Sequence, residues 1–364
     1  MRSDRVFTLP NPVGQMNEQI ITEYLCCPQC RSGKLDVDAF EREGSEIRHA
    51  VVLCRDCHMW YRLEDGLLEL LVPELRLPGT DAAFRARMVQ SGKRWNYGSN
   101  SPTDGPGDEH KLGQKLFFDE DAAAYETKTM RLPFWRILNR LYLRTIVEWA
   151  KGHSTMIEIG GGSGRISIPI RSSFKTILSF DISETMVRRA MRRVGKLAPR
   201  PTNLHFFVAD AENIPVQSGS ADVAIFTGIL HHVAHPARVI SETARTLDAD
   251  GRLIGMENNR SFLRPVFDRL MQFKRLWDEK AHPVHFIISS RELHAWFSKA
   301  GVTCKAWTSV YMPPHVFNAL PDRVGERLLR FTNAVGGRIP VLRHHGGLVF
   351  FTGEKTSTEV PVHA

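Results

Sequence analysis

The stretch Glu158-Ile159-Gly160-Gly161-Gly162-Ser163-Gly164 is a glycine-rich loop, and it decides the fold. It follows the short apolar run 155–159, which is typical of a strand, and it leads into a predicted helix. Glycines in such a loop adopt positive φ angles and let a ligand approach the backbone closely. The N-terminus of the next helix then faces that ligand. Strand, loop and helix together predict a ligand site, whereas an isolated glycine motif would say little.

Strands and helices alternate on both sides of this loop. A further helix is predicted at 131–151, and terminal strands are predicted at 302–310 and 348–353. Alternating strands and helices predict an α/β fold with a parallel sheet and right-handed crossovers. Between these limits the predicted strands are 155–159, 176–180, 204–208, 221–226 and 251–256, and the predicted helices are 184–196 and 235–248.

A nicotinamide dinucleotide is the main alternative ligand for a glycine loop in this position. However, Arg165 stands where the dinucleotide fingerprint has its third glycine. Carboxylates also occur at Glu158, inside the first strand, and at Asp210, after the third strand. These differences disfavour the dinucleotide.

Four motifs together resemble class I methyltransferases of the ubiquinone/menaquinone type, across roughly residues 120–355. The resemblance implies a Rossmann-like, seven-stranded methyltransferase sheet with a helical lid, S-adenosyl-L-methionine as cofactor and S-adenosyl-L-homocysteine as product. The motifs are the glycine loop, Phe180-Asp181-Ile182-Ser183, Ala209-Asp210-Ala211 and Gly228-Ile229-Leu230-His231-His232-Val233.

The resemblance also implies a role for each matching position. Glu158 would anchor the ammonium of the methionine moiety, Asp181 would accept both ribose hydroxyls, and Asp210 would accept from the adenine amino group. Taken singly, Asp181 and Asp210 could instead be helix caps or turn residues. The set predicted to bind the cofactor is Glu158, Gly160, Gly161, Gly162, Gly164, Asp181, Ile182, Met186, Asp210, Ala211 and Thr227.

Two adjacent histidines follow the fourth strand, at the crevice where acceptor and methyl group would meet. His231 and His232 are the candidate catalytic bases, because an imidazole with an ordinary pKa near ~6.5 can remove a proton at neutral pH. The alternative is that both are structural and that alignment alone carries the reaction. By the same resemblance, His282 and His285 would lie over the acceptor. A substrate lid is predicted at about 260–300. The part at 262–277 mixes apolar and basic residues. For that part, the alternatives are a membrane-surface helix and a pocket for a lipid-like acceptor.

Two CxxC pairs occur near the N-terminus, Cys27-Pro28-Gln29-Cys30 and Cys54-Arg55-Asp56-Cys57. Two such turns can present four thiolates to one tetrahedral zinc ion, with a redox dithiol as the alternative. Four protein ligands leave no open position, so the predicted zinc is structural. The segment resembles the zinc ribbon of the small activator proteins that partner tRNA and protein methyltransferases.

The bulk composition limits the classes of protein. The chain has 364 residues, 42% hydrophobic and 24% charged, which fits a globular protein with more than one domain. No run reaches the ~18–20 apolar residues of a membrane span, and no signal-peptide core is visible, which predicts a cytoplasmic protein. The net charge of +8 could attract nucleic acid, anionic lipid or an acidic small molecule, but it does not choose among them.

These observations give one leading hypothesis and two alternatives. We predict a zinc-ribbon module at 1–78, a linker with N-terminal helices at 79–150, and a methyltransferase domain at 151–364. The enzyme would methylate an O, N or C atom of a small or medium-sized metabolite, such as a lipid-like molecule or a natural-product intermediate. The alternatives are an RNA base methyltransferase and a protein-interaction scaffold built on the zinc module.

Overall fold

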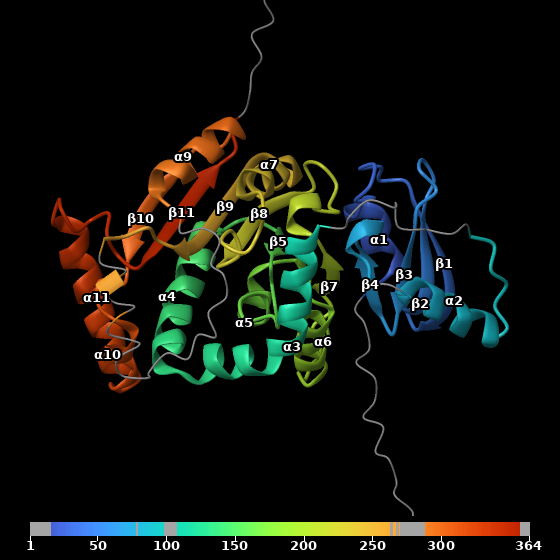
Figure 1. Ribbon diagram of the computed structural model, residues 1–364, viewed down its shortest axis with the longest axis horizontal. Coiled ribbons are helices and arrows are strands. Elements are labelled where there is room, and N and C mark those ends of the chain that lie inside the picture. Colours follow the sequence, from blue (N-terminus) through green and yellow to red (C-terminus); the bar gives the residue numbers. More distant parts are fainter. Residues whose placement is uncertain are drawn as a thin grey trace, which may run out of the picture.

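The computed structural model describes residues 16–77, 79–97, 108–262, 265–266, 269 and 288–356. The described strands form one eleven-stranded sheet in the order β1-β2-β3-β4-β7-β6-β5-β8-β9-β11-β10. Figure 1 shows this sheet running along the molecule, with β1–β4 at one end and β10 at the other.

The seven C-terminal strands confirm the predicted α/β sheet. Each predicted strand is present, with ends that shift by only a few residues. β5, β6, β7, β8 and β9 pair with one another in parallel, whereas β11 pairs antiparallel with both β9 and β10. The strands are β5 (Thr155–Ile159), β6 (Thr176–Asp181), β7 (Leu204–Ala209), β8 (Ala221–Thr227), β9 (Leu247–Asn258), β10 (Lys305–Ser309) and β11 (Leu348–Glu354).

Helices cover both faces of this sheet. Apolar side chains of α4 (Pro133–Trp149), α6 (Glu184–Gly195), α10 (Pro314–Asn318) and α11 (Asp322–Arg338) join the core on one face. Those of α7 (Pro236–Thr246), α9 (Ser290–Lys299) and α1 (Glu18–Tyr24) join the core on the other. A short helix, α5 (Ser167–Ile170), follows the glycine loop. The result is the three-layer arrangement expected for alternating strands and helices.

The cysteine-bearing segment forms an antiparallel meander that continues the same sheet. β1 (Leu35–Glu43), β2 (Glu46–Cys54), β3 (Trp60–Glu64) and β4 (Leu67–Leu70) pair in sequence order. β4 then pairs in parallel with β7, so that Leu68 lies opposite Phe207. An unpaired edge strand leaves backbone donors and acceptors without partners, and this pairing satisfies them. The predicted seven-stranded sheet is therefore extended by the module and does not end at β7.

The region between module and core is more helical than predicted. The segment 91–115 is rich in Ser, Gly, Pro, Asn and Asp, which predicts a loop, but α3 (Glu109–Arg131) already begins at Glu109, after α2 (Thr80–Gln90). The expectation was wrong for 109–115 because polar residues there pair with carboxylates of the core, which local composition does not reveal. The predicted lid at about 260–300 lies mostly outside the described residues, and α9 lies at its C-terminal end. Within the described part of the chain, no helix is long and apolar enough to cross a membrane.

Candidate functional site

A cavity of about 100 Å³, partly open to solvent, lies at the carboxyl ends of β5–β8. In parallel sheets these ends and the loops after them form the usual ligand site. α3 supplies one wall, which no motif in the sequence indicates. The cavity is lined by Lys111, Gln114, Phe118, Gly160, Gly162, Phe180, Asp181, Ile182, Met186, Ala209, Asp210, Ala211, Glu212, Thr227, Gly228, Ile229, His232 and Val233.

The glycines of the loop have two roles: some leave space for a ligand, and others allow close packing. Gly160 and Gly162 both have positive φ and line the cavity. A Cβ atom on Gly160 would come within 2.5 Å of the Ile229 side chain, whereas one on Gly162 would meet no atom within 4 Å. The open side of Gly162 is therefore the place where a ligand can approach the backbone.

Three predicted cofactor residues do not line the cavity. Gly161 and Gly164 pack against side chains of the core, so each excludes a Cβ for reasons of space. Glu158 is buried, burial raises its pKa, and its Oε2 accepts a hydrogen bond of 2.8 Å from the Ser179 hydroxyl. The other eight line the cavity: Gly160, Gly162, Asp181, Ile182, Met186, Asp210, Ala211 and Thr227.

Asp181 ends β6 and orders the loops beside the cavity. Its two carboxylate oxygens accept backbone N–H groups, from Gly162 at 3.0 Å and from Ser183 at 2.9 Å. Burial raises the pKa of Asp181 to about 6 despite these hydrogen bonds. Each oxygen retains a lone pair, so a structural role and an acceptor role toward ribose are compatible.

Asp210 begins the short helix η3 (Ala211–Asn213) and meets a lysine from α3. The Lys111 ammonium lies 2.8 Å from Oδ2 of Asp210 and 3.1 Å from Oε2 of Glu212. Asn213 Nδ2 donates to the same Asp210 oxygen at 2.7 Å. Asp210 is thus fixed from two directions, by α3 and by η3. No motif around Lys111 signalled this contact.

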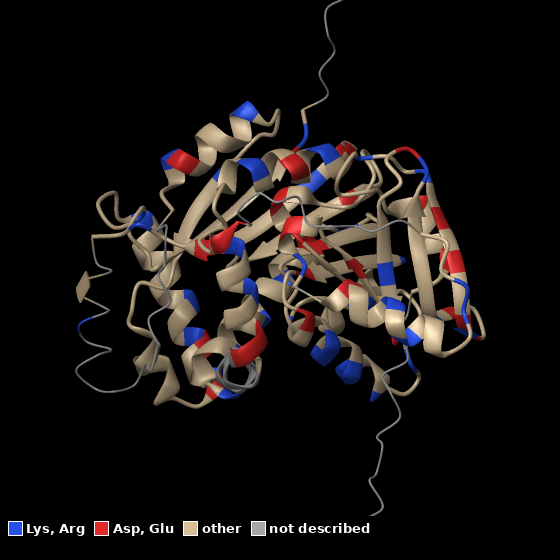
Figure 2. Cartoon of the chain, turned by 45° about the vertical axis from the view of Figure 1, so that its right-hand side comes forward, with Lys and Arg blue, Asp and Glu red and all other residues tan. Residues whose placement is uncertain are grey.

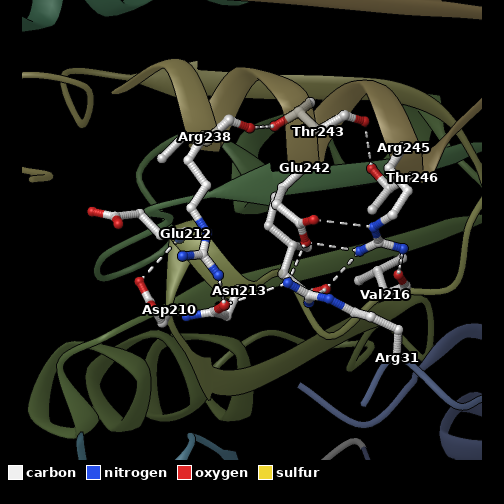
Figure 3. A network of polar contacts seen from close by, with 12 residues as sticks. Arg31, Asp210, Glu212, Asn213, Val216, Arg238, Glu242, Thr243, Arg245 and Thr246 are labelled. Atoms are coloured by element: carbon white, nitrogen blue, oxygen red, sulfur yellow. Dashed lines mark hydrogen bonds and ion pairs between the residues drawn. The ribbon is translucent and has the colours of Figure 1, made fainter. Parts of the chain in front are cut away.

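Figure 3 shows that the polar network around Asp210 continues to the cysteine-bearing module. Arg31 directly follows Cys30, and its guanidinium donates to the Ile214 carbonyl at 3.0 Å and the Asn213 side chain at 3.4 Å. It also forms an ion pair of 2.8 Å with Glu242 on α7. Because Asn213 also holds Asp210, one asparagine bridges the module and the cavity wall.

The two candidate bases lie differently. His231 is buried and does not line the cavity. Its Nδ1 donates to Oε2 of Glu257 at 2.7 Å, and Oε1 of Glu257 accepts from the backbone N–H groups of Ile229 and Leu230. Glu257 therefore orders the loop after β8 and orients His231.

His232 lines the cavity, and residues of α3 contact its side chain and its backbone. Its ring lies edge to face with Phe118, with 5.1 Å between centroids. The His110 ring nitrogen lies 2.8 Å from the His232 carbonyl. The two other histidines predicted near the acceptor, His282 and His285, lie outside the described residues.

The four predicted metal ligands come together in one cluster. The sulfur atoms of Cys27, Cys30, Cys54 and Cys57 all lie within 4.8 Å of one another. The pairs Cys27–Cys57 and Cys30–Cys54 are 3.5 Å and 3.6 Å apart. Tetrahedral zinc with ~2.3 Å bonds separates its sulfur ligands by ~3.8 Å, so this donor set fits zinc.

Comparison with known proteins points to one class. A family model described as a methyltransferase domain matches residues 131–306, a little under half of the chain. That segment is therefore similar to a methyltransferase domain, as predicted.

Two relatives and one solved structure are similar to parts of this chain. The chain is 28% identical, over 44% of its length and 65% of the relative, to a ubiquinone/menaquinone biosynthesis C-methyltransferase of Acidiphilium cryptum. It is 31% identical, over 38% of its length and 47% of the relative, to the 27-O-demethylrifamycin SV methyltransferase of Amycolatopsis mediterranei. The chain thus spans less than two thirds of these two relatives. A solved structure of a SAM-dependent methyltransferase from Thermotoga maritima matches with a TM-score of 0.44 and 20% identity, covering 66% of this chain and 99% of that one.

Proposed function

We propose that this protein is an S-adenosyl-L-methionine-dependent methyltransferase that acts on a small or medium-sized metabolite and releases S-adenosyl-L-homocysteine. The observation that carries this proposal is the cavity, in which the open side of Gly162 and the carboxylates of Asp181 and Asp210 line one space. This arrangement offers a backbone surface for the methionine moiety and acceptors for ribose and for the adenine amino group.

The chemistry needs an aligned nucleophile more than an elaborate set of catalytic groups. The acceptor atom attacks the sulfonium methyl group, a new bond to the methyl carbon forms, and the carbon–sulfur bond breaks. An oxygen or protonated nitrogen acceptor also has to lose a proton. We propose His232 for this step because it lines the cavity, and His231 with Glu257 as the support of its loop.

The histidine assignment is tested by two alanine variants. His232→Ala should lower turnover of a proton-losing acceptor by ~10²–10⁴-fold, with donor affinity nearly unchanged. His231→Ala should lower the melting temperature, because Glu257 would lose a buried partner. If His232→Ala keeps near-parental turnover on the true acceptor, alignment alone carries the reaction.

The cysteine cluster is proposed to hold one structural zinc ion. Four thiolates complete a tetrahedral shell, and such closed sites stabilise folds without taking part in reactions. We also propose that the module spans residues 1–78, that the methyltransferase domain spans residues 151–364, and that the protein is cytoplasmic.

A small-molecule acceptor is better supported than RNA. The names of both relatives describe methylation in small-molecule biosynthesis. Figure 2 shows acidic and basic residues interspersed over the chain. Two arginines of α6 are engaged by other groups of the protein. Arg188 pairs with Glu184, and Arg193 donates to the Ser163 carbonyl. The scaffold alternative does not explain a cavity lined by donor-binding residues.

Titration calorimetry with S-adenosyl-L-homocysteine tests the proposal. The parent should bind, and Gly162→Arg should weaken binding at least ~100-fold, because the new side chain fills the cavity. Gly219→Arg is the matched control, since Gly219 also has positive φ and open space but does not line the cavity. No binding to the folded parent, or equal affinity in both variants, would refute the donor site.

A further inference from the structure

Helix α11 exposes a row of large apolar side chains. Val324, Phe331 and Val335 are 49%, 66% and 42% exposed, and Ile339 and Val341 extend the row past the helix with 39% and 69%. Steps of seven and four residues place the three helical members on one face. Soluble proteins rarely align large apolar side chains in this way without a binding purpose.

The acidic side chains of α11 face α4, whereas its basic side chains are exposed. The two carboxylates of α11, Asp322 and Glu326, turn toward α4, where Asp322 pairs with Arg136 at 2.7 Å and Glu326 pairs with Arg144 at 2.8 Å. The arginines of the helix remain at the surface. They are Arg323, Arg327, Arg330 and Arg338, all exposed.

Two of these arginines flank the apolar row directly. Arg327 precedes Phe331 by four residues, and Arg338 follows Val335 by three, so each lies beside an exposed apolar side chain. The surface is therefore both apolar and cationic, while Asp322 is occupied by α4 and Glu326 is shared between α4 and Arg330. An amphipathic helix of this composition is suited to the interface of an anionic bilayer.

We propose that α11 docks on an anionic lipid surface, with Phe331, Val335 and Ile339 in the interface and Arg327 and Arg338 against lipid phosphates. A second copy of the chain fits less well, because a two-fold contact through this face would bring equal arginine rows together. Figure 1 places α11 at the end of the molecule opposite the cysteine-bearing module. The inference does not depend on the proposed methyl transfer.

Co-sedimentation of the full chain with vesicles tests this proposal. The protein should bind vesicles of phosphatidylcholine and phosphatidylglycerol (3:1) at least tenfold better than vesicles of phosphatidylcholine alone, and high salt should weaken the binding. A double variant, Phe331→Ser with Val335→Ser, should lose at least tenfold in binding. The double variant Arg327→Gln with Arg338→Gln should lose the preference for phosphatidylglycerol.

Val89→Ser is the matched control, because Val89 is also 50% exposed but lies on α2, in the N-terminal part of the chain. It should bind vesicles as the parent does, and melting temperatures should show that every variant is folded. The proposal is overturned if the parent does not bind anionic vesicles, or if the α11 variants bind as well as Val89→Ser. It is also overturned if light scattering shows a dimer that the Phe331→Ser and Val335→Ser changes dissociate.

Discussion

The seven-stranded part of the sheet, β5 to β11, is finished differently at its two edges, β7 and β10. At one end, β4 pairs with β7, and buried charges join the module to the core. At the other end, β10 is an edge strand whose Trp307 is 41% exposed, and α11 beside it presents apolar side chains to the surface. The first end is closed by contacts within the chain, and the second is open to a partner. Damage to the first should therefore reach the donor cavity, and damage to the second should not.

The largest effect is expected from the metal cluster. Cys54→Ser should remove the zinc and unfold the module, because structural zinc contributes ~10–16 kcal/mol of apparent binding free energy in small zinc domains. Metal analysis should fall from about one zinc per chain, and the melting temperature should fall with it. Cys304→Ser, outside the cluster, should keep both. A well-folded parent without metal would contradict the zinc assignment.

A buried ion network at the seam should have the next largest effect. Arg62 on β3 is 6% exposed and lies 2.6 Å from Glu69 and 2.9 Å from Glu184. Arg62→Ala leaves both carboxylates without this partner, which should cost ~3–5 kcal/mol in the free energy of unfolding. Denaturant titration measures this cost.

The matched control is another pair across the same seam. Arg200 and Glu46 are each partly exposed and 3.1 Å apart, so Arg200→Ala should cost at most ~1 kcal/mol. Equal losses in the two variants would mean that burial of Arg62 does not decide its contribution.

The Arg31 network distinguishes stability from ligand binding. Arg31→Ala removes one of the two arginine donors to Asn213, which holds Asp210, while Arg238 keeps the other, so affinity for S-adenosyl-L-homocysteine should fall about fivefold, by ~1 kcal/mol. The loss should shrink for S-inosyl-L-homocysteine, which lacks the amino group that Asp210 would accept. A loss of the same size for both ligands would indicate a general structural effect.

The smallest expected effect is a pH dependence of donor affinity that arises from Asp181 in the cavity. Burial raises the pKa of Asp181 to about 6, so the folded state binds more protons than the unfolded state between the ordinary carboxyl value and pH 6. The contribution of Asp181 to stability should therefore fall as pH rises through this window, while donor affinity rises because ribose hydroxyls bind the ionised form. Calorimetry from pH 5 to 8 should show this rise in the parent, and Asp181→Asn should flatten it.

The sequence alone determined the features that depend on local pattern. The predicted strands, the glycine loop and the position of Asp181 at the end of β6 follow from short-range periodicity and spacing, which act within a few residues. The four cysteines are likewise defined by two CxxC turns, and the structure brings their sulfur atoms together.

Only the tertiary structure decided which distant groups meet. Lys111 pairs with Asp210 across 99 positions, Arg31 reaches Ile214 across 183, and β4 pairs with β7 far along the chain. Lysines and arginines are common on exposed helices and loops, so nothing local marks Lys111 or Arg31 as partners of groups in the core. Such contacts arise because a buried carboxylate requires a partner and an edge strand requires a neighbour, and packing chooses which residue supplies each.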